Sequence, residues 1–225
     1  GVARCALMIN AGSRDELANE FGIAHFTEHG FFKGTEHRKA YQVNCRLENL
    51  GGELNAFTSK EDTTVHATVL RGDFTKAVEL LADVVFHSTF PDKELDKERE
   101  VILDEINTYR DSPNDDIYDT FEDLIFAGSE LGHNILGTPR SLKGIDSAAI
   151  HRFRQRTHTT DKMVFASIGN ISPKRIKEIA ERYLGCYAPT KREFERVAPV
   201  VVAPFEKVLN KRTHQAHCII GARAY

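Results

Sequence analysis

The chain has 225 residues, of which 41% are hydrophobic and 28% charged, a composition typical of globular proteins with one large domain or two small ones. The formal net charge is −3, so no basic surface indicates binding to nucleic acid. No apolar run approaches the roughly 20 residues that cross a bilayer, so we expect no membrane span. The four cysteines are far apart and form no Cys-x-x-Cys pair, which predicts free thiols.

Strand-like and helix-like hydrophobic patterns follow one another along the chain. Strands are predicted at 2–10, 54–58, 63–70 and 163–169, and the polar turn 59–62 indicates a β-hairpin. Helices are predicted at 22–32, 40–50, 74–86, 91–109, 115–126, 147–157 and 173–184, with Ser147 as the N-cap of the sixth. Residues 163–169 are interpreted as a buried strand, 188–203 as a proline-rich linker, and 216–225 as a strand without a partner.

In the first predicted helix, His25 and His29 are four residues apart. This spacing places both imidazoles on one face, where they can bind the same metal ion. Glu28 stands where its carboxylate can act as a general base, as in the His-x-x-Glu-His zinc enzymes. A chance pairing on a solvated face is the alternative, since the chain has ten histidines. The apolar flanking residues favour a partly buried helix and therefore a metal. His37, in the next turn, is interpreted as a surface residue rather than a ligand.

Two carboxylates lie on the apolar face of the predicted helix 91–109. At about 100° per residue, Glu98 and Glu105 fall in the same arc as Leu95, Ile102, Ile106 and Tyr109. Unpaired buried carboxylates are costly, so both need partners. A metal held by His25 and His29 is one partner, with one carboxylate as the third protein ligand, and arginines are the alternative.

The predicted strand 54–58 carries few charges, so an extended peptide could join it by main-chain pairing. The alternative is an ordinary interior or half-buried strand, and the residues of this segment alone favour that interpretation.

Taken together, three segments resemble the pitrilysin and insulinase family of zinc metallopeptidases, to which mitochondrial processing peptidase belongs. They are the helix with His25, Glu28 and His29, the stretch Gly51-Gly52-Glu53-Leu54-Asn55-Ala56-Phe57-Thr58, and the stretch from Glu98 to Glu105. The separation of 76 positions from His29 to Glu105 fits the family's spacing. The sequence departs from the family pattern at Thr27, Gly30 and Phe31, where many relatives carry larger aliphatic residues.

The resemblance assigns roles residue by residue. It implies that His25, His29 and Glu105 bind Zn²⁺ and that Glu28 activates a water molecule. Glu98 matches a second glutamate that supports the ligands, so Glu28 and Glu98 are the expected catalytic residues. The resemblance also implies that Asn55, Ala56 and Phe57 lie on an edge strand that binds the substrate, which reverses the interpretation from residues alone.

The same resemblance implies an α/β (α+β) fold in two layers, with a mostly antiparallel sheet packed on helices. We expect residues 1–203 to form the zinc-bearing unit, lacking its first strand, and 204–225 to form a linker and the start of a second unit near His214. The expected partners are a peptide substrate and a second homologous unit, in the same chain or in a homo- or heterodimer. A cytoplasmic location is expected, with the periplasm or mitochondrial matrix as alternatives.

The sequence therefore predicts a zinc-dependent endopeptidase. One alternative is a peptide-binding or scaffolding half of a complex without catalytic activity, against which the intact base and third ligand argue. Another is a metal hydrolase that acts on small molecules, which would gain little from an edge strand.

Overall fold

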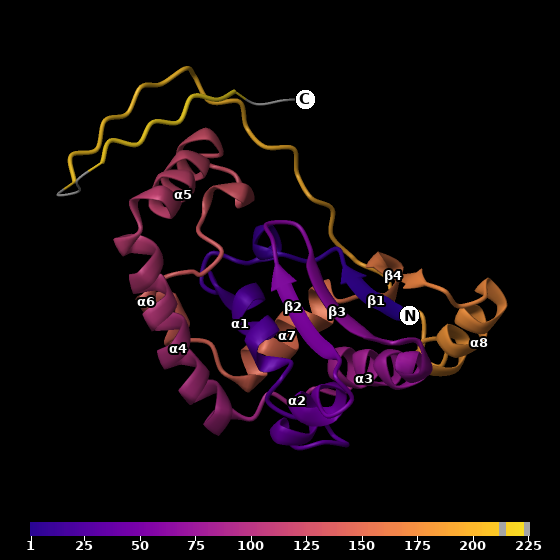
Figure 1. Cartoon of the computed structure of the whole chain (residues 1–225). Helices are drawn as coiled ribbons and strands as arrows, with labels where there is room; N and C mark the ends of the chain where they lie inside the picture. Colours follow the sequence, from indigo (N-terminus) through magenta and orange to yellow (C-terminus); the bar gives the residue numbers. More distant parts are fainter. Residues whose placement is uncertain (212–214, 223–225) are drawn as a thin grey trace.

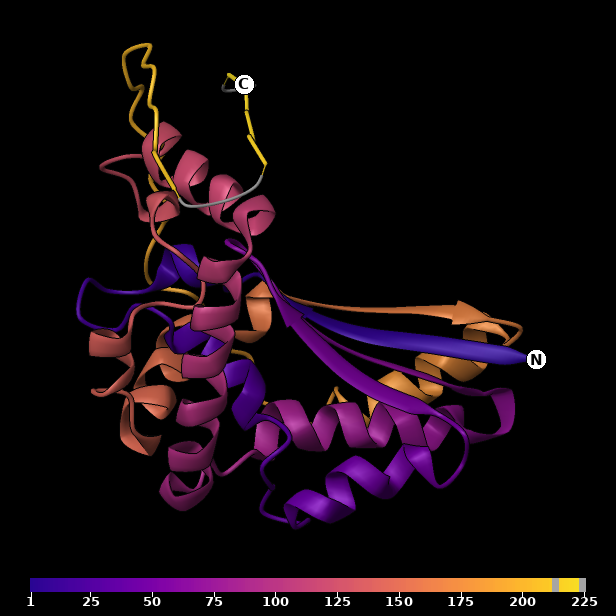
Figure 2. The same cartoon turned by 60° about the vertical axis from the view of Figure 1, so that its left-hand side comes forward.

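The computed structural model describes residues 1–211 and 215–222 of the chain. In these residues a four-stranded sheet lies over a layer of helices, and further helices cover one end of both layers (Figures 1 and 2). The strands are β1 (Val2–Ile9), β2 (Glu53–Thr58), β3 (Thr63–Leu70) and β4 (Met163–Gly169). The helices are α1 (Ile23–Gly30), α2 (Ala40–Glu48), α3 (Phe74–His87), α4 (Asp92–Asp111), α5 (Pro113–Ile125), α6 (Pro139–Leu142), α7 (Ser147–Thr157) and α8 (Pro173–Tyr183).

The strand order is β2-β3-β1-β4, and each neighbouring pair is antiparallel. The predicted two-layer α/β fold with a mostly antiparallel sheet is therefore confirmed. β2 lies at one edge of the sheet, where it pairs with β3 alone among the described strands. The edge position that the family resemblance implied for this strand is thus present.

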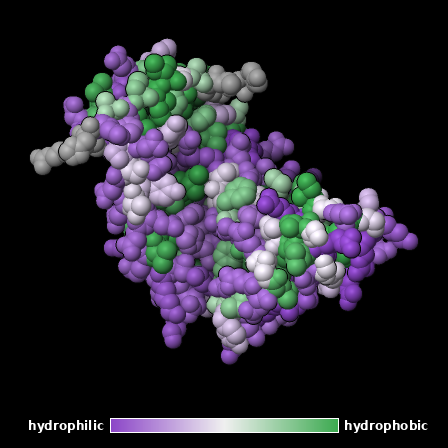
Figure 3. Space-filling model, viewed as in Figure 1, coloured by the Kyte–Doolittle hydropathy of each residue, from purple (hydrophilic) through white to green (hydrophobic). Residues whose placement is uncertain are grey.

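The two faces of the sheet differ because side chains alternate along each strand. The inner face packs on α3, whose buried side includes Val78, Leu81 and Val85. The outer face carries the exposed apolar side chains Val2, Met8, Phe57, Leu70, Val164 and Ile168. In Figure 3 apolar residues accordingly gather over the strands on this face.

Three details of the predicted elements are wrong. Among the described strands only β1 pairs with β4, so β4 is an edge strand, and its Val164 and Ile168 are exposed on the uncovered outer face of the sheet. The N-cap of α7 is Asp146, whose carboxylate accepts from the Ala149 N–H, and Ser147 is the first helical residue. Tyr109 is 47% exposed, because the last turns of α4 extend beyond the core that buries Leu95 and Ile102.

The predicted strand 216–225 is also wrong where it can be compared, because residues 216–222 form no strand. Its last three residues and His214, the expected start of a second unit, lie outside the described residues. No helix in the described part of the chain is long and apolar enough to cross a membrane. The four cysteines are free thiols, as predicted.

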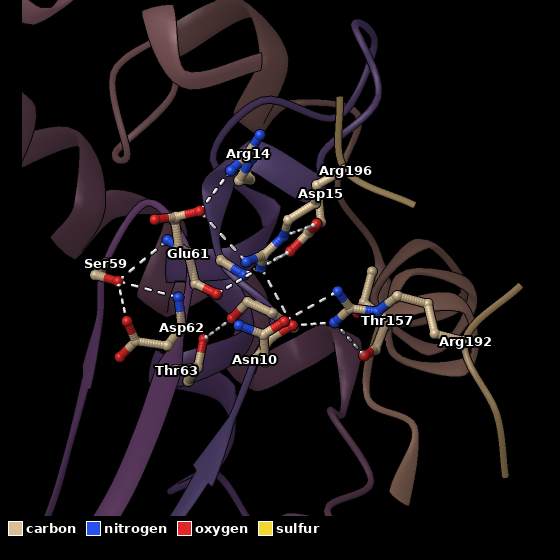
Figure 4. A network of polar contacts seen from close by, with 12 residues as sticks. Asn10, Arg14, Asp15, Ser59, Glu61, Asp62, Thr63, Thr157, Arg192 and Arg196 are labelled. Atoms are coloured by element: carbon tan, nitrogen blue, oxygen red, sulfur yellow. Dashed lines mark hydrogen bonds and ion pairs between the residues drawn. The ribbon is translucent and has the colours of Figure 1, made fainter. Parts of the chain in front are cut away.

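The segment after α8 is extended, as the linker prediction required, yet it is held to the body of the protein (Figure 4). Arg196 donates to both carboxylate oxygens of Asp15, at 2.9 and 2.7 Å, and to the Glu61 carbonyl. Arg192 donates to the side chain of Asn10 at 3.2 Å. The start of this segment is therefore fixed beside the β2–β3 hairpin.

Candidate metal centre

Helix α1 places the motif at the border between the core and solvent. Ile23, Ala24, Phe26, Thr27 and Gly30 are buried, whereas His25, Glu28 and His29 are half-buried. Gly30 is required for close packing, because a Cβ atom there would lie 2.5 Å from Cδ1 of Phe90. The departure from larger family residues at this position thus has a local cause, since the ring of Phe90 fills the space.

The N-terminus of α1 is held by a buried carboxylate that the sequence analysis missed. Glu16 accepts from the Gly22 N–H at 2.9 Å and from the Ala24 N–H at 2.8 Å, and its Oε2 lies 2.9 Å from Nε2 of His133. Burial raises the pKa of Glu16, and these partners partly offset that effect. Neither residue occupies a standard capping position, so the local sequence gave no signal of this role.

The structure brings Glu105 of α4 to both histidines, as predicted. Its Oε2 lies 3.7 Å from Nε2 of His25 and 3.6 Å from Nε2 of His29. This oxygen is buried and has no hydrogen-bond partner, although the side chain as a whole is 37% exposed. Ligand atoms at 2.0–2.1 Å from a tetrahedral zinc ion would lie roughly 3.3 Å apart. The two imidazoles and one carboxylate therefore fit zinc in both chemistry and spacing.

His25 is in the protonation state that metal binding requires. Burial, together with the neighbouring His29, lowers the pKa of His25 to about 3, so this imidazole is neutral at physiological pH. The two rings meet edge to face with centroids 4.6 Å apart. A neutral imidazole can direct a nitrogen lone pair toward an ion that Glu105 also binds.

Glu98 lies behind His29 rather than at the metal position. The His29 Nδ1–H donates to Glu98 Oε2 at 2.9 Å, which leaves Nε2 of the ring free to bind a metal. Lys33 holds the other carboxylate oxygen at 2.5 Å. Burial alone would raise the pKa of Glu98, but Lys33 and His29 outweigh it and lower the pKa. The geometry gives Glu98 a positioning role, and Lys33 is a member of this site that the sequence analysis did not single out.

Glu28 links the candidate metal centre to the edge strand. Desolvation raises the pKa of its carboxyl group, and the nearby charge of Glu105 adds to this effect. Hydrogen bonds from the hydroxyl and backbone N–H of Thr58, together with His29, only partly oppose the rise. A carboxylate with a raised pKa is suited to accept and return a proton.

The free edge of β2 presents alternate peptide groups. The Ser59 N–H donates to the Asp62 carbonyl at 2.8 Å, and hydrogen-bonded and non-hydrogen-bonded pairs alternate from there along the ladder with β3. Asn55 and Phe57 consequently direct their main-chain groups toward β3, whereas Leu54, Ala56 and Thr58 direct theirs outward. The outward Ala56 N–H is bonded to Asn55 Oδ1 at 2.9 Å, and the Thr58 N–H is close enough to Glu28 to lower the pKa of its carboxyl group.

The side chains on this strand also differ from one another. Asn55 and Phe57 are exposed on the outer face of the sheet, and Ala56 is buried beneath it. The three predicted substrate-binding residues thus offer an outward peptide group at Ala56 and two accessible side chains beside it. Thr58 is the residue of this strand that the sequence analysis left out.

Comparison with known proteins gives a consistent assignment. Residues 1–139 match the family described as "Insulinase (Peptidase family M16)", and residues 144–225 match "Peptidase M16 inactive domain". The chain is 37% identical over 214 residues to an uncharacterized zinc protease of Bacillus subtilis, covering 95% of this chain and 52% of that protein. It is 31% identical over 183 residues to the mitochondrial-processing peptidase subunit beta of Saccharomyces cerevisiae, covering 81% of this chain and 40% of that protein.

Among solved structures, a protease from Helicobacter pylori matches with a TM-score of 0.81 and 22% identity, over 89% of this chain and 48% of that one. At this identity the likeness shows the fold alone. The chain spans about half the length of the curated relatives it matches. Because a family model matches more than half of its residues, the chain belongs to the insulinase family of peptidases, M16.

Proposed function

We propose that the protein containing this chain is a zinc-dependent endopeptidase that cleaves peptides held in extended form along β2. The observation that carries the proposal is the position of Glu28, between the three metal-binding side chains and the main chain of the edge strand. A general base in this position serves both the water and the peptide bond that it attacks.

The residues of the site have separate roles. His25, His29 and Glu105 hold the ion, and zinc, when bound, supplies Lewis acidity that activates water near neutral pH. Glu28 accepts the proton of the attacking water at its carboxylate and returns that proton to the leaving amine. Glu98 and Lys33 fix the ring of His29, so that its Nε2 keeps facing the ion.

A peptide adds to the free edge of β2 through the outward peptide groups of Leu54 and Ala56 and the outward carbonyl of Thr58. The bond from the Ala56 N–H to Asn55 Oδ1 would then be replaced by a bond to the substrate carbonyl. A small molecule has no repeating peptide groups for this edge. Competition by an unreactive extended peptide therefore separates a peptidase from a small-molecule hydrolase, because only the peptidase should be inhibited.

A second homologous unit completes the enclosure of the substrate in this proposal. The support is that the chain spans about half of its relatives and that the outer face of the sheet is apolar and exposed. We expect the 225 residues alone to bind zinc but to cleave peptides slowly. Rapid turnover by the isolated chain would contradict this part. The division of the chain near residue 203 and the cytoplasmic location stay predictions.

The test is hydrolysis of a quenched fluorescent peptide mixture by the full-length protein and by its Glu28→Gln variant at equal zinc content. Loss of a general base should slow cleavage roughly 10²–10⁴-fold without loss of zinc. Glu48→Gln, at an exposed position in the last turn of α2, is the matched control and should cleave like wild type. Equal inactivity of wild type and Glu28→Gln, both with zinc bound, would instead favour the non-catalytic scaffold.

A further inference from the structure

A second group of metal-binding side chains lies apart from the candidate metal centre. Glu36 and His37 are in the turn between α1 and α2, and His87 is the last residue of α3. Their ligand atoms all lie within 4.8 Å of one another. Among the described residues, this group and the set of His25, His29 and Glu105 are the two in which such donors converge.

The backbone holds the two segments of this group together. The Glu36 N–H donates to the His87 carbonyl at 2.9 Å, and Thr35 and Ser88 form an isolated antiparallel bridge. The Thr89 N–H donates to the Gly34 carbonyl at 3.1 Å on the far side of that bridge. The donors are therefore carried on paired main chain, which fixes the backbone positions of the two segments relative to each other.

The histidine pair has nearly the same geometry as the pair in the candidate metal centre. The rings of His37 and His87 meet edge to face with centroids 4.7 Å apart and an angle of 72° between planes. The corresponding values for His25 and His29 are 4.6 Å and 64°. Two imidazoles in this arrangement can direct one nitrogen each toward a shared ion.

An outer carboxylate orients His37 as Glu98 orients His29. The His37 Nδ1–H donates to Oδ1 of buried Asp83 at 2.6 Å, which leaves Nε2 free to bind a metal. Arg38 holds the other oxygen of Asp83 at 2.5 Å, the role that Lys33 has toward Glu98. The positive charge of Arg38 is also paired with Glu79 at 2.6 Å, so it is neutralised locally rather than directed at the donors.

His87 is oriented from its other side. Its Nε2 lies 3.0 Å from the hydroxyl of Tyr187, whose ring stacks on Phe86 with centroids 3.7 Å apart. Its Nδ1 lies 3.0 Å from Oε2 of Glu36. The Tyr187 hydroxyl oxygen can accept a hydrogen bond from the Nε2–H, so that Nδ1 becomes the metal-binding atom and Glu36 lies beside it as a carboxylate ligand.

We propose that Glu36, His37 and His87 form a second, exchangeable site for a divalent transition-metal ion of the zinc class. Two imidazoles and one carboxylate suit such ions, and the remaining coordination positions would hold water. The exposure of the Glu36 and His37 side chains, 65% and 57%, makes the site open to solvent and weaker than the buried centre.

The test is titration of the purified, metal-free protein with Zn²⁺ alone, followed by calorimetry and by direct metal analysis after dialysis. Wild type should bind two equivalents, a tight one and a weaker one. His87→Gln should keep the tight equivalent and lose the weaker one, whereas His25→Gln should do the reverse. His151→Gln, which removes an exposed histidine outside both groups, should bind two equivalents like wild type.

Glu36→Gln gives an independent variant at an exposed position, where a change of fold is not expected. Loss of a direct ligand should weaken the second equivalent by more than the roughly 10–100-fold that removal of an outer partner costs. The proposal is overturned if wild type binds a single equivalent, or if His87→Gln and Glu36→Gln bind Zn²⁺ as wild type does.

Discussion

Glu98→Gln tests whether the carboxylate behind His29 governs metal affinity. The substitution keeps the shape of the side chain but removes the negative charge of the carboxylate, which accepts a hydrogen bond from His29 at 2.9 Å and pairs with Lys33 at 2.5 Å. Removal of an outer-shell partner costs roughly 10–100-fold in metal affinity, about 1.4–2.8 kcal/mol. We expect the lower end if the Gln side-chain oxygen still accepts from His29, and the upper end if the ring rotates.

The assay is competition for Zn²⁺ between the protein and a chromogenic chelator of known affinity. Glu100→Gln is the matched control, because Glu100 lies two residues further along α4 and is exposed. The control should bind Zn²⁺ like wild type. Equal affinities for wild type and Glu98→Gln, or an equal loss in both variants, would refute the positioning role.

Three further predictions concern stability and reactivity. Gly30→Ala should lower the free energy of unfolding by about 1–3 kcal/mol in urea, because its Cβ would overlap the ring of Phe90; an unchanged midpoint would contradict the close packing. Asp83→Asn should lower the free energy of unfolding by about 2 kcal/mol at neutral pH, because hydrogen bonds from His37, Arg38 and Thr35 outweigh desolvation and lower the pKa of Asp83. A carboxyl group with a lowered pKa stabilises the fold at pH values above its unfolded-state pKa, and this contribution is lost as the pH falls through its folded-state pKa. The stability difference between Asp83→Asn and wild type should therefore shrink below pH about 4, and a difference that stays constant with pH would contradict this reasoning. Burial raises the pKa of Cys5 to about 12, so this thiol should react with a disulfide reagent only on unfolding, after the exposed thiols; early labelling would show that β1 opens.

The elements with a strong hydrophobic period were predicted well from the sequence. Helix α4 shows why, since Leu95, Ile102 and Ile106 repeat at helical spacing and all three are buried. The same period placed Glu98 and Glu105 toward the histidines, and both carboxylates lie there. Tyr109 fits the period equally well but is exposed, because periodicity marks a face of a helix and not the point where the core ends.

Partners that are distant in sequence were not predictable in this way. Glu16 and His133 are 117 residues apart, and no local pattern joins a loop carboxylate to the start of α1. The prediction that residues 163–169 form a buried strand was wrong for a related reason. Its residues are apolar on both faces, as in a strand covered on both sides, but in the described structure no layer covers the outer face of the sheet, and the strand order leaves β4 at an edge.

The register of the β2–β3 hairpin connects the fold to the proposed chemistry. Because hydrogen-bonded pairs alternate, one pair fixed at Ser59 and Asp62 determines that Ala56 and Thr58 direct their peptide groups outward. The Thr58 N–H then lies close enough to Glu28 to lower the pKa of its carboxyl group, and two residues away the Ala56 N–H is bonded only locally, to Asn55 Oδ1. A shift of one residue would reverse both orientations and move Asn55 and Phe57 into the core. In the proposed mechanism, the same pairing that closes the hairpin would therefore align a bound peptide with Glu28, so substrate position and catalytic geometry would depend on one structural constraint.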